Sequence, residues 1–409
     1  MKTKFLLLLG FIALLTSCND DDGGTSVVAK ERKDIVLSRS EEQLANESMD
    51  FAFRLFQQVN STERQSNWMI SPLSASMALG MMTNGAAGNT LEEMKATLGF
   101  SNFDLDGMNA YYRKLVTELL GLDNTTQLSI ANSVWVKEGL PINEAFVKVN
   151  QEMYDAEVSN LNFSSPEAKS IINNWCADKT NNTIKDVSSF ISDKMELASI
   201  NALYFKGNWK KQFKKSETKD ETFTNADGSE SEVPMMNQKE HFLYAYNDDF
   251  HIAEFQYGNA AFSMVILLPY EGKTLDESLK NLTRENWEEW YNGCQSKELM
   301  VKLPRFEINY DKSLTEDMVA LGMTEAFDKN LADFSSISPD KIYLSTLNQF
   351  TYIKVDEEGT EAAATTIIRG DGVNIAVPSS KFHVNRPFAF MIKEKSTGTI
   401  LFMGKVTKL

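Results

Sequence analysis

Cysteine is scarce in this sequence, whose 409 residues contain three, at Cys18, Cys176 and Cys294. So few cysteines exclude the framework of disulfides that holds many small exported proteins together. Cys176 and Cys294 could form one bridge at most, and Cys176 lies in a run with helical periodicity. The hydrophobic residues, 42% of the chain, must therefore hold the fold, and a chain of this length can bury a large core.

Histidine is equally scarce, and the spacings that mark metal or catalytic sites are missing. The three histidines are scattered, at His241, His251 and His383, and no Cys-x-x-Cys or His-x-x-x-His pair occurs. The chain also lacks the Gly-x-Ser-x-Gly turn of many hydrolases and a phosphate-binding loop of the P-loop type. The sequence therefore predicts no metal, no cofactor and no catalytic residues.

One pair of residues has the spacing of a known catalytic motif. Ser338 and Lys341 have the Ser-x-x-Lys spacing of serine acylases, in which the lysine helps to deprotonate the serine. In those enzymes the motif opens a helix near the start of the domain, whereas here it lies late, in a loop directly before a strand-like run. We interpret Ser338 as the cap of a turn.

A basic surface is also missing. The chain has 41 lysines and arginines against 57 aspartates and glutamates, which gives a net charge of −16. No run of basic residues is interleaved with aromatic residues, so we expect no nucleic-acid partner. The acidity indicates a soluble, well-solvated surface.

Linkers and internal repeats are absent from most of the chain. From about Ser40 onward, helical and strand-like periods alternate steadily, interrupted only by a short polar turn at residues 224–232. We predict a single domain over residues 41–409, preceded by a flexible acidic tether at residues 18–40.

The amino terminus is typical of an export signal. Two lysines precede an apolar run from Phe5 to Leu15, which is too short to span a bilayer comfortably. Residues 1–17 are therefore predicted to be a signal peptide. Such a signal is either cleaved in the ordinary way, so that the cysteine after it is incidental, or is followed by a cysteine that carries a lipid anchor.

The end of this signal resembles the bacterial lipobox, in which a cysteine is acylated and becomes the first mature residue. That cysteine is Cys18, in the tetrad LTSC, and the acidic stretch NDDDGGTS follows it. The stretch loosely resembles the sorting signals of Bacteroidetes-type surface lipoproteins. We expect an exported lipoprotein, anchored through Cys18 to the outer membrane or cell surface, with its domain on the extracellular side.

The stretch from Val355 to Lys381, VDEEGTEAAATTIIRGDGVNIAVPSSK, combines helix-like composition with strand-like order. Its alanines favour a helix, but Gly359 opens the run, β-branched residues close it, and two further glycines follow. Every second residue from Thr360 is uncharged, whereas the alternate positions carry the charges. The pattern suits both an exposed loop and a strand with one small face that packs on a core.

Six blocks of the chain resemble signature segments of the serpins, in family order. They are NWMISPLSASMALGMMTNGAAGNTLEEM at Asn67, NALYFKGNWKKQF at Asn201, VPMMNQ at Val233, LPRFEI at Leu303, VDEEGTEAAATT at Val355 and NRPFAFMIKEKSTGTILFMGKV at Asn385. The resemblance covers about Ser40 to Leu409. It implies an α+β fold with three β-sheets, eight or nine helices and an exposed reactive-centre loop at about residues 357–381.

The resemblance also implies a function. In inhibitory serpins a protease attacks the loop, an acyl-enzyme forms, and the cleaved loop inserts into the central sheet as a new strand, which distorts the protease. We therefore expect a suicide-substrate inhibitor of serine endopeptidases, not an enzyme. Neither proline nor an inward charge interrupts the residues that match the family's hinge, which are Glu357, Gly359, Thr360, Glu361, Ala362, Ala363, Ala364 and Thr365.

Other positions carry over by motif. Arg305 and Glu357 match a charge pair at the top of the central sheet, where insertion begins, and Trp209 matches the tryptophan of that region. Ser71, Ser74 and Asn201 match the polar cluster that gates the opening of the sheet. The chain departs from the family pattern at Gln349, where a histidine is usual. Gln349 could hydrogen-bond in its place, without the pH sensitivity of an imidazole.

Family spacing selects Val373-Asn374 as the cleaved bond, fourteen residues after the hinge glycine. A small β-branched residue fits the shallow pocket of elastase-like proteases, so these are the first expected partners, with subtilisin- or papain-like proteases as others. Arg369 is the rival of Val373 as the residue before the cleaved bond, and Asn374 and Ile375 are close alternatives for the same position. The competing function is a non-inhibitory serpin, a monomeric binding module that proteases cleave as a simple substrate.

Overall fold

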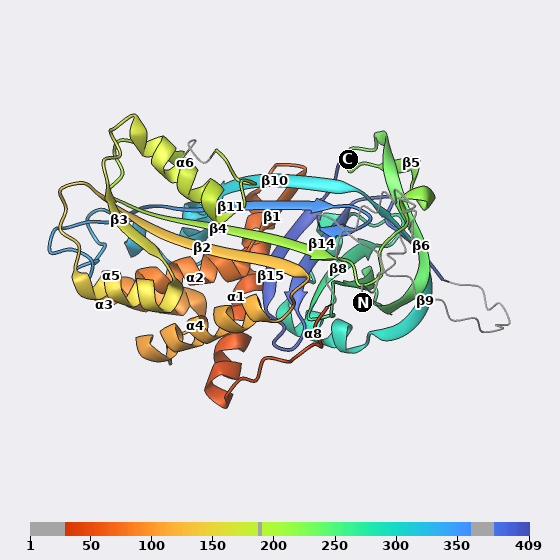
Figure 1. Cartoon of the computed structure of the whole chain (residues 1–409), viewed down its shortest axis with the longest axis horizontal. Helices are drawn as coiled ribbons and strands as arrows, with labels where there is room; N and C mark the ends of the chain where they lie inside the picture. Colours follow the sequence, from red (N-terminus) through yellow and green to blue (C-terminus); the bar gives the residue numbers. More distant parts are fainter. Residues whose placement is uncertain (1–28, 187–189, 361–379) are drawn as a thin grey trace, which may run out of the picture.

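A six-stranded sheet runs along the long axis of the molecule in the computed structural model, which describes residues 29–186, 190–360 and 380–409. Figure 1 shows its long strands running side by side. Its order is β10-β11-β4-β2-β3, with β12 also paired to β4. These strands are β2 (Thr126–Lys137), β3 (Glu157–Leu161), β4 (Leu197–Asn208), β10 (Phe306–Ser313), β11 (Leu344–Val355) and β12 (Gly359–Thr360). We call it the central sheet.

A second sheet has nine strands, of which β5, β6 and β9 lie at one end of the molecule and β1, β14 and β15 near its middle. Its order is β1-β15-β14-β8-β7-β6-β9-β13, with β5 also paired to β6. Its strands are β1 (Asn67–Ile70), β5 (Lys219–Thr224), β6 (Glu230–Tyr246), β7 (Phe250–Gln256), β8 (Phe262–Pro269), β9 (Gln295–Pro304), β13 (Ser380–His383), β14 (Phe388–Glu394) and β15 (Ile400–Val406).

The described strands thus form two hydrogen-bonded sheets where the resemblance implies three. The reason is β6, a 17-residue strand. Its first part pairs with β5 and β9, and its last residues pair with β7. One continuous strand therefore joins two groups of strands into one ladder.

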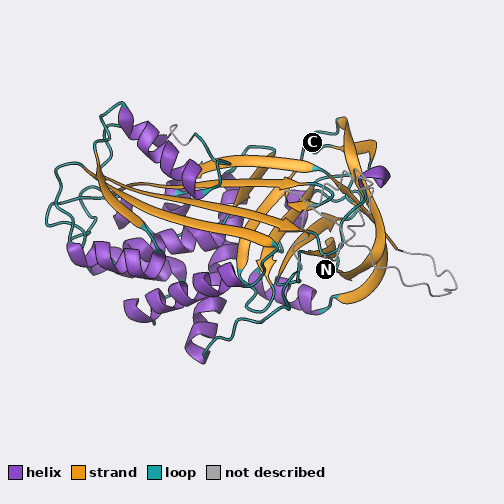
Figure 2. Ribbon diagram, in the orientation of Figure 1, coloured by secondary structure: helices purple, strands orange, loops and turns teal. Residues whose placement is uncertain are grey.

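Nine α-helices lie in the described part of the chain, which agrees with the expected eight or nine and confirms the α+β class (Figure 2). Most of them cover one side of the central sheet, and α6 lies on its opposite face. The helices are α1 (Arg39–Thr62), α2 (Pro72–Thr83), α3 (Gly88–Leu98), α4 (Leu105–Gly121), α5 (Glu144–Tyr154), α6 (Glu167–Lys179), α7 (Leu275–Leu279), α8 (Arg284–Asn292) and α9 (Thr315–Ala320).

Helix α2 lies at the centre of the fold. Every one of its twelve residues is buried, as expected for a helix that is apolar on all sides. It begins where Ser71 accepts a hydrogen bond from the backbone N–H of Ser74 and Pro72 occupies the first turn, an arrangement that favours helix starts. The helix therefore places Ser71 and Ser74 directly behind the central sheet.

Strand β4 separates two hydrophobic clusters by its alternation. Leu203 and Phe205 belong to the main core, on the side of α2, whereas Ile200 and Ala202 belong to a smaller cluster under α6. Successive side chains of a strand point to opposite faces of a sheet. Odd-numbered residues of β4 thus face the main core, and even-numbered residues face α6.

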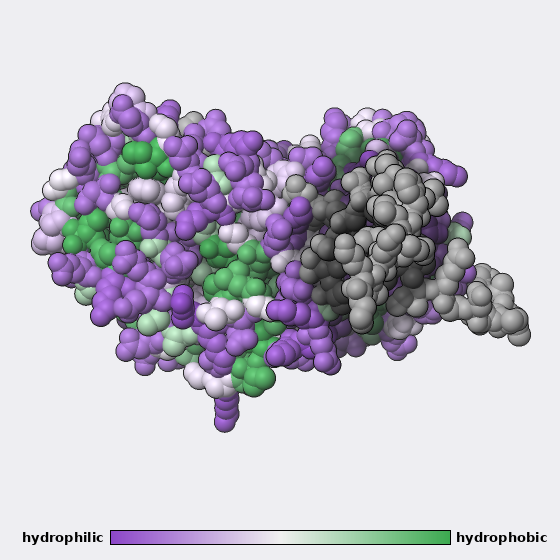
Figure 3. Space-filling view, in the orientation of Figure 1, coloured by the Kyte–Doolittle hydropathy of each residue, from purple (hydrophilic) through white to green (hydrophobic). Residues whose placement is uncertain are grey.

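Cys176 and Cys294 are both free thiols, so the single bridge that the sequence allowed does not form. No helix within residues 29–186, 190–360 and 380–409 is long and apolar enough to cross a membrane. The described residues on the face that Figure 3 shows are mainly hydrophilic, with separate hydrophobic patches between them.

Candidate functional site

The base of the loop at residues 355–360 is a tight turn that leads into a new strand. Strand β11 ends at Val355, and the Asp356 N–H donates to the Gly359 carbonyl at 2.9 Å. Gly359 has a φ of +147°, and a Cβ there would lie 2.1 Å from the Gly207 carbonyl oxygen. Only glycine fits this conformation and this close approach. It pairs with Asn208, and Thr360 pairs with Gly207, both antiparallel.

Arg305 and Glu357 form an ion pair above the end of β11. The Nε of Arg305 donates to both carboxylate oxygens of Glu357, at 2.9 and 3.0 Å. The Glu357 side chain is 1% exposed, whereas that of Arg305 is 41% exposed. Burial alone would raise the pKa of Glu357, but hydrogen bonds from Arg305 and Thr218 hold it below its usual value. The structure thus brings together the two charges that the sequence matched to the top of the sheet.

Trp209, which follows β4, binds the same turn through two hydrogen bonds. Its indole Nε1–H donates to the Asp356 carbonyl and its backbone N–H to the Glu358 carbonyl, both at 2.8 Å. The indole stacks on Tyr257 with ring centres 4.4 Å apart. Arg305, Trp209 and the hinge residues Glu357 and Gly359 therefore form one site, which holds the start of the loop against β4.

Gln349 joins β11 to the start of α2. Its Oε1 accepts from the Ser71 N–H at 2.7 Å, and its Nε2 donates to the Ser71 carbonyl at 2.8 Å and the Ser74 hydroxyl at 3.3 Å. The side-chain amide pairs with the Ser71 backbone as one strand pairs with another, which a histidine ring could not do. Gln349 is 3% exposed, so these bonds are shielded from water.

Asn201 lies level with Gln349 in the parallel ladder between β4 and β11. Its amide donates to Asn132 Oδ1 on β2, and the amide of Asn132 donates to the Tyr154 carbonyl at 3.1 Å. The Asn201 Oδ1 and the Ser199 hydroxyl are buried without a hydrogen-bond partner among the described residues. Buried polar groups without a hydrogen bond cost free energy, so these two groups destabilise the sheet as it stands.

Several predicted site residues lie outside the described residues. They are Cys18, Glu361, Ala362, Ala363, Ala364, Thr365, the rival Arg369, and the bond Val373-Asn374. Thr360 is described by its backbone alone.

Sequence reasoning missed two partners of this site, Thr218 and Asn132. Thr218 donates to Glu357, and Asn132 accepts from Asn201. Neither carries a local motif. Asn132 comes to lie opposite Asn201 only through the alignment of β2 with β4.

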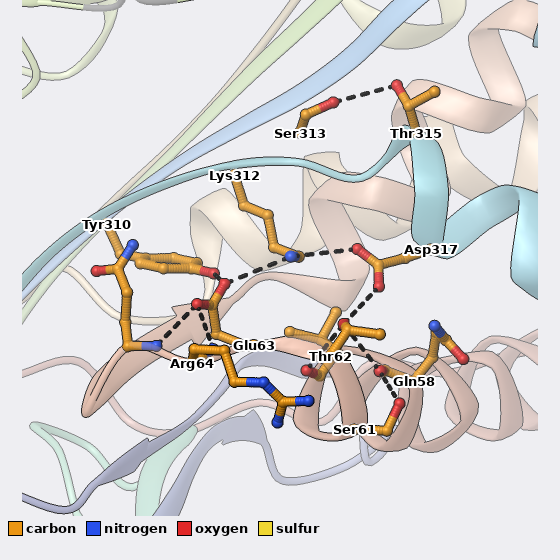
Figure 4. Close-up of polar contacts among 12 residues, drawn as sticks. Gln58, Ser61, Thr62, Glu63, Arg64, Tyr310, Lys312, Ser313, Thr315 and Asp317 are labelled. Atoms are coloured by element: carbon orange, nitrogen blue, oxygen red, sulfur yellow. Dashed lines mark hydrogen bonds and ion pairs between the residues drawn. The ribbon is translucent and has the colours of Figure 1, made fainter.

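A further polar cluster lies at the far end of β10 (Figure 4). Lys312 of β10 lies 3.4 Å from the carboxylates of both Glu63 and Asp317, and Tyr310 donates to Glu63. Burial raises the pKa of Glu63, but hydrogen bonds from the Tyr310 hydroxyl and from two backbone N–H groups lower it to about 2. The cluster ties β10 to the end of α1, at the opposite end of the strand from Arg305.

Ser338 and Lys341 do not form a catalytic pair. The Ser338 hydroxyl accepts from the Asp340 N–H at 3.3 Å, and the Lys341 ammonium donates to the Asn330 carbonyl. This is the capping contact expected of a turn. No group of three or more metal-ligating side chains occurs in the part of the chain that the structure describes.

Comparisons with known proteins agree with this geometry. A family model described as "Serpin (serine protease inhibitor)" matches residues 46–409. Human neuroserpin is 32% identical over 369 residues, covering 87% of this chain and 90% of that protein. Human leukocyte elastase inhibitor is 31% identical over 380 residues, covering 89% and 99%. The crystal structure of tengpin, a thermophilic serpin in the native state, has a TM-score of 0.84 at 30% identity and covers 94% and 98%.

Proposed function

The chain belongs to the serpin family, and we propose that it is a suicide-substrate inhibitor of serine endopeptidases, elastase-like ones first. The observation that carries the proposal is β12. Its two residues pair antiparallel with β4, in line with the space between β4 and β11. The hinge therefore starts on the path that an inserted strand would follow.

The register of β12 defines which residues would face the core after insertion. Thr360 lies opposite Gly207, so continuing the antiparallel pairing would set Ala362 opposite Phe205 and Ala364 opposite Leu203. Phe205 and Leu203 face the main core. Small, uncharged side chains would thus enter the tightly packed side, where a charge would be costly.

The same register would satisfy one of the two orphaned groups of the ladder. Thr366 would lie opposite Asn201, whose Oδ1 has no partner among the described residues. A threonine hydroxyl supplies one donor. Insertion would therefore bring a hydrogen bond to a buried oxygen that lacks one.

Insertion would also replace one parallel ladder by two antiparallel ones. Strands β4 and β11 now pair in parallel over Leu344–Tyr352, and a strand entering between them runs antiparallel to both. Parallel pairing is slightly less stable per residue. With about ten new hydrogen bonds at roughly 0.5–1.5 kcal/mol each, plus apolar burial, the gain would be on the order of 10 kcal/mol.

We place the attacked bond at Val373-Asn374, because fourteen residues after Gly359 is the family spacing and a valine suits a shallow elastase-like pocket. Cleavage after Arg369 would leave a shorter segment to insert. Mass spectrometry of the released carboxyl-terminal peptide decides between them. A peptide that starts at Gly370 would refute the Val373 assignment.

A covalent complex with the protease is the direct test. The domain that follows Cys18 is mixed with neutrophil or pancreatic elastase and run on a denaturing gel beside a Thr360→Arg variant. We expect a band of the summed mass for the parent and none for the variant, because the charge would face the core. Elastase with a blocked active-site serine is the control and should give no band.

A non-inhibitory binding module is the second candidate, and Gln349 favours it because the sequence departs from the family there. Clean cleavage of both proteins without the heavy band would support it, if repeated with trypsin-, chymotrypsin-, subtilisin- and papain-like proteases.

We further propose that the protein is an exported, monomeric lipoprotein, with the signal, tether and domain at residues 1–17, 18–40 and 41–409. Its support is the lipobox-like tetrad that ends at Cys18. Incorporation of labelled palmitate that persists in a Cys18→Ala variant would contradict the anchor.

A further inference from the structure

The ladder between β4 and β11 ends just before two lysines. Its last pair is Tyr204 with Tyr352, and two residues further along each strand the same register brings Lys206 level with Lys354. Among the described residues, β11 pairs there only with β10, and β4 pairs with β2 and β12. The central sheet thus splits at the level of these lysines.

Both lysines point to the α6 side of the sheet. They share the parity of Ala202 on β4 and Phe350 on β11, which belong to the cluster under α6. Both are half-buried. Equal charges at neighbouring positions of a sheet repel each other, so the pair opposes closure of the split.

Among the described residues, no carboxylate lies within 4 Å of either ammonium, although neighbouring cations have partners. Arg305 binds Glu357, and Lys215 binds Glu358. Glu307, opposite Lys354 on β10, instead accepts from the Tyr352 hydroxyl at 3.0 Å. A groove of about 590 Å³ opens beside Lys354, and Arg305 and Lys215 line it together with the acidic residues Glu307, Asp356 and Glu357. Lys354 therefore combines a positive charge that has no carboxylate partner among the described residues with space beside it.

We propose that Lys206 and Lys354 form a cationic clamp that holds the Glu361 carboxylate once the loop has inserted, an inference that rests on the proposed insertion. Thr360 pairs with Gly207, so the next residue would lie opposite Lys206 and on the same face. Strands in a sheet are about 4.8 Å apart, so Glu361 would lie between the two lysines. The clamp would oppose a closed sheet before insertion and be neutralised afterwards.

A synthetic peptide with the sequence of residues 360–373 tests the clamp without a protease. The intact protein is incubated with this peptide, or with a peptide carrying Glu361→Gln, and the annealing rate is followed by fluorescence anisotropy at 20 mM and 500 mM salt. We expect the parent peptide to anneal about tenfold faster at low salt, and less so at high salt. In a Lys206→Gln/Lys354→Gln protein the two peptides should anneal at equal rates.

A Lys210→Gln/Lys219→Gln protein is the matched control, because both lysines are exposed and lie outside this register; it should keep the tenfold ratio. Equal rates in the parent protein, or a tenfold ratio that survives in the Lys206→Gln/Lys354→Gln protein, would overturn the clamp alone. If neither peptide anneals to any protein, both the clamp and the proposed insertion are wrong.

Discussion

Replacing Gln349 by leucine tests whether the glutamine supports the fold in place of the usual histidine. Leucine has a similar volume but no polar atoms. The Ser71 N–H would lose its partner at 2.7 Å, and a buried donor left unsatisfied costs about 1–3 kcal/mol. The Ser71 carbonyl would keep its bond from the Ala75 N–H at 3.0 Å, so that loss adds only about 0.5–1.5 kcal/mol. We expect the free energy of unfolding to fall by about 2–4 kcal/mol.

Urea denaturation of the uncleaved protein, followed by circular dichroism, measures this change. Gln127→Leu is the matched control, because Gln127 is exposed on the neighbouring strand β2, and it should change the free energy by no more than about 0.5 kcal/mol. A Gln349→Leu protein within about 0.5 kcal/mol of the parent would refute the reasoning. Its meaning would be that the Ser71 N–H finds another partner when the amide is removed.

Four further predictions concern single residues. Glu357→Gln should lower the free energy of unfolding by about 1–2 kcal/mol, a modest loss because Arg305 is partly exposed to solvent. Urea titrations in low salt and in 1 M salt measure it, and a loss that does not shrink at high salt would contradict the prediction. The pKa of Glu63 is lowered to about 2, so Glu63→Gln should cost about 2 kcal/mol at pH 7, and the difference should fade as the pH drops from 4.5 toward 2; the same loss at pH 2.5 and 7 would refute it. Burial lowers the pKa of Lys393 to about 8, so its charge destabilises the fold below pH 8. Lys393→Met should therefore be more stable than the parent at pH 7, by up to about 3 kcal/mol, with an advantage that shrinks toward pH 10. The Lys393 ammonium lies 3.8 Å from the centre of the Tyr291 ring, and a less stable variant at pH 7 would show that this cation–π contact outweighs the cost of burial. Gly359→Ala should disrupt β12 and reduce the covalent complex with elastase several-fold on a gel, whereas Gly121→Ala, where a Cβ meets no atom within 4 Å, should not; an unchanged yield would show that β12 is not needed.

Most of the fold was predictable, because the serpin-like blocks are contiguous stretches of sequence. The number of helices and the α+β class follow from them. The number of hydrogen-bonded sheets did not, since it depends on whether β6 runs unbroken from β9 to β7. A strand's length is visible in sequence, but its partners are chosen by the packing of distant segments.

The candidate site divides in the same way. Gly359, Glu357 and Gln349 were recognisable from their motifs, and so was the substitution of glutamine for histidine. The resemblance placed Gln349 in one cluster with Ser71, but it did not show that the side-chain amide pairs with both backbone groups of Ser71, because the two residues are 278 positions apart. The same holds for the cluster of Glu63, Lys312 and Asp317, in which each charge has an ordinary local context.

The sequence by itself determined the elements that depend on neighbouring residues: the helix starts, the uncharged alternate positions of the loop, and the glycine that a positive φ requires. The tertiary structure alone decided which residues meet across strands, because register is set when the whole sheet packs against the core. That register places two lysines level with each other where β4 and β11 part, and leaves one oxygen of Asn201 without a partner among the residues that the structure describes. Hydrogen bonds and charges act over a few ångströms, so what they do here depends on the fold that brings their groups together.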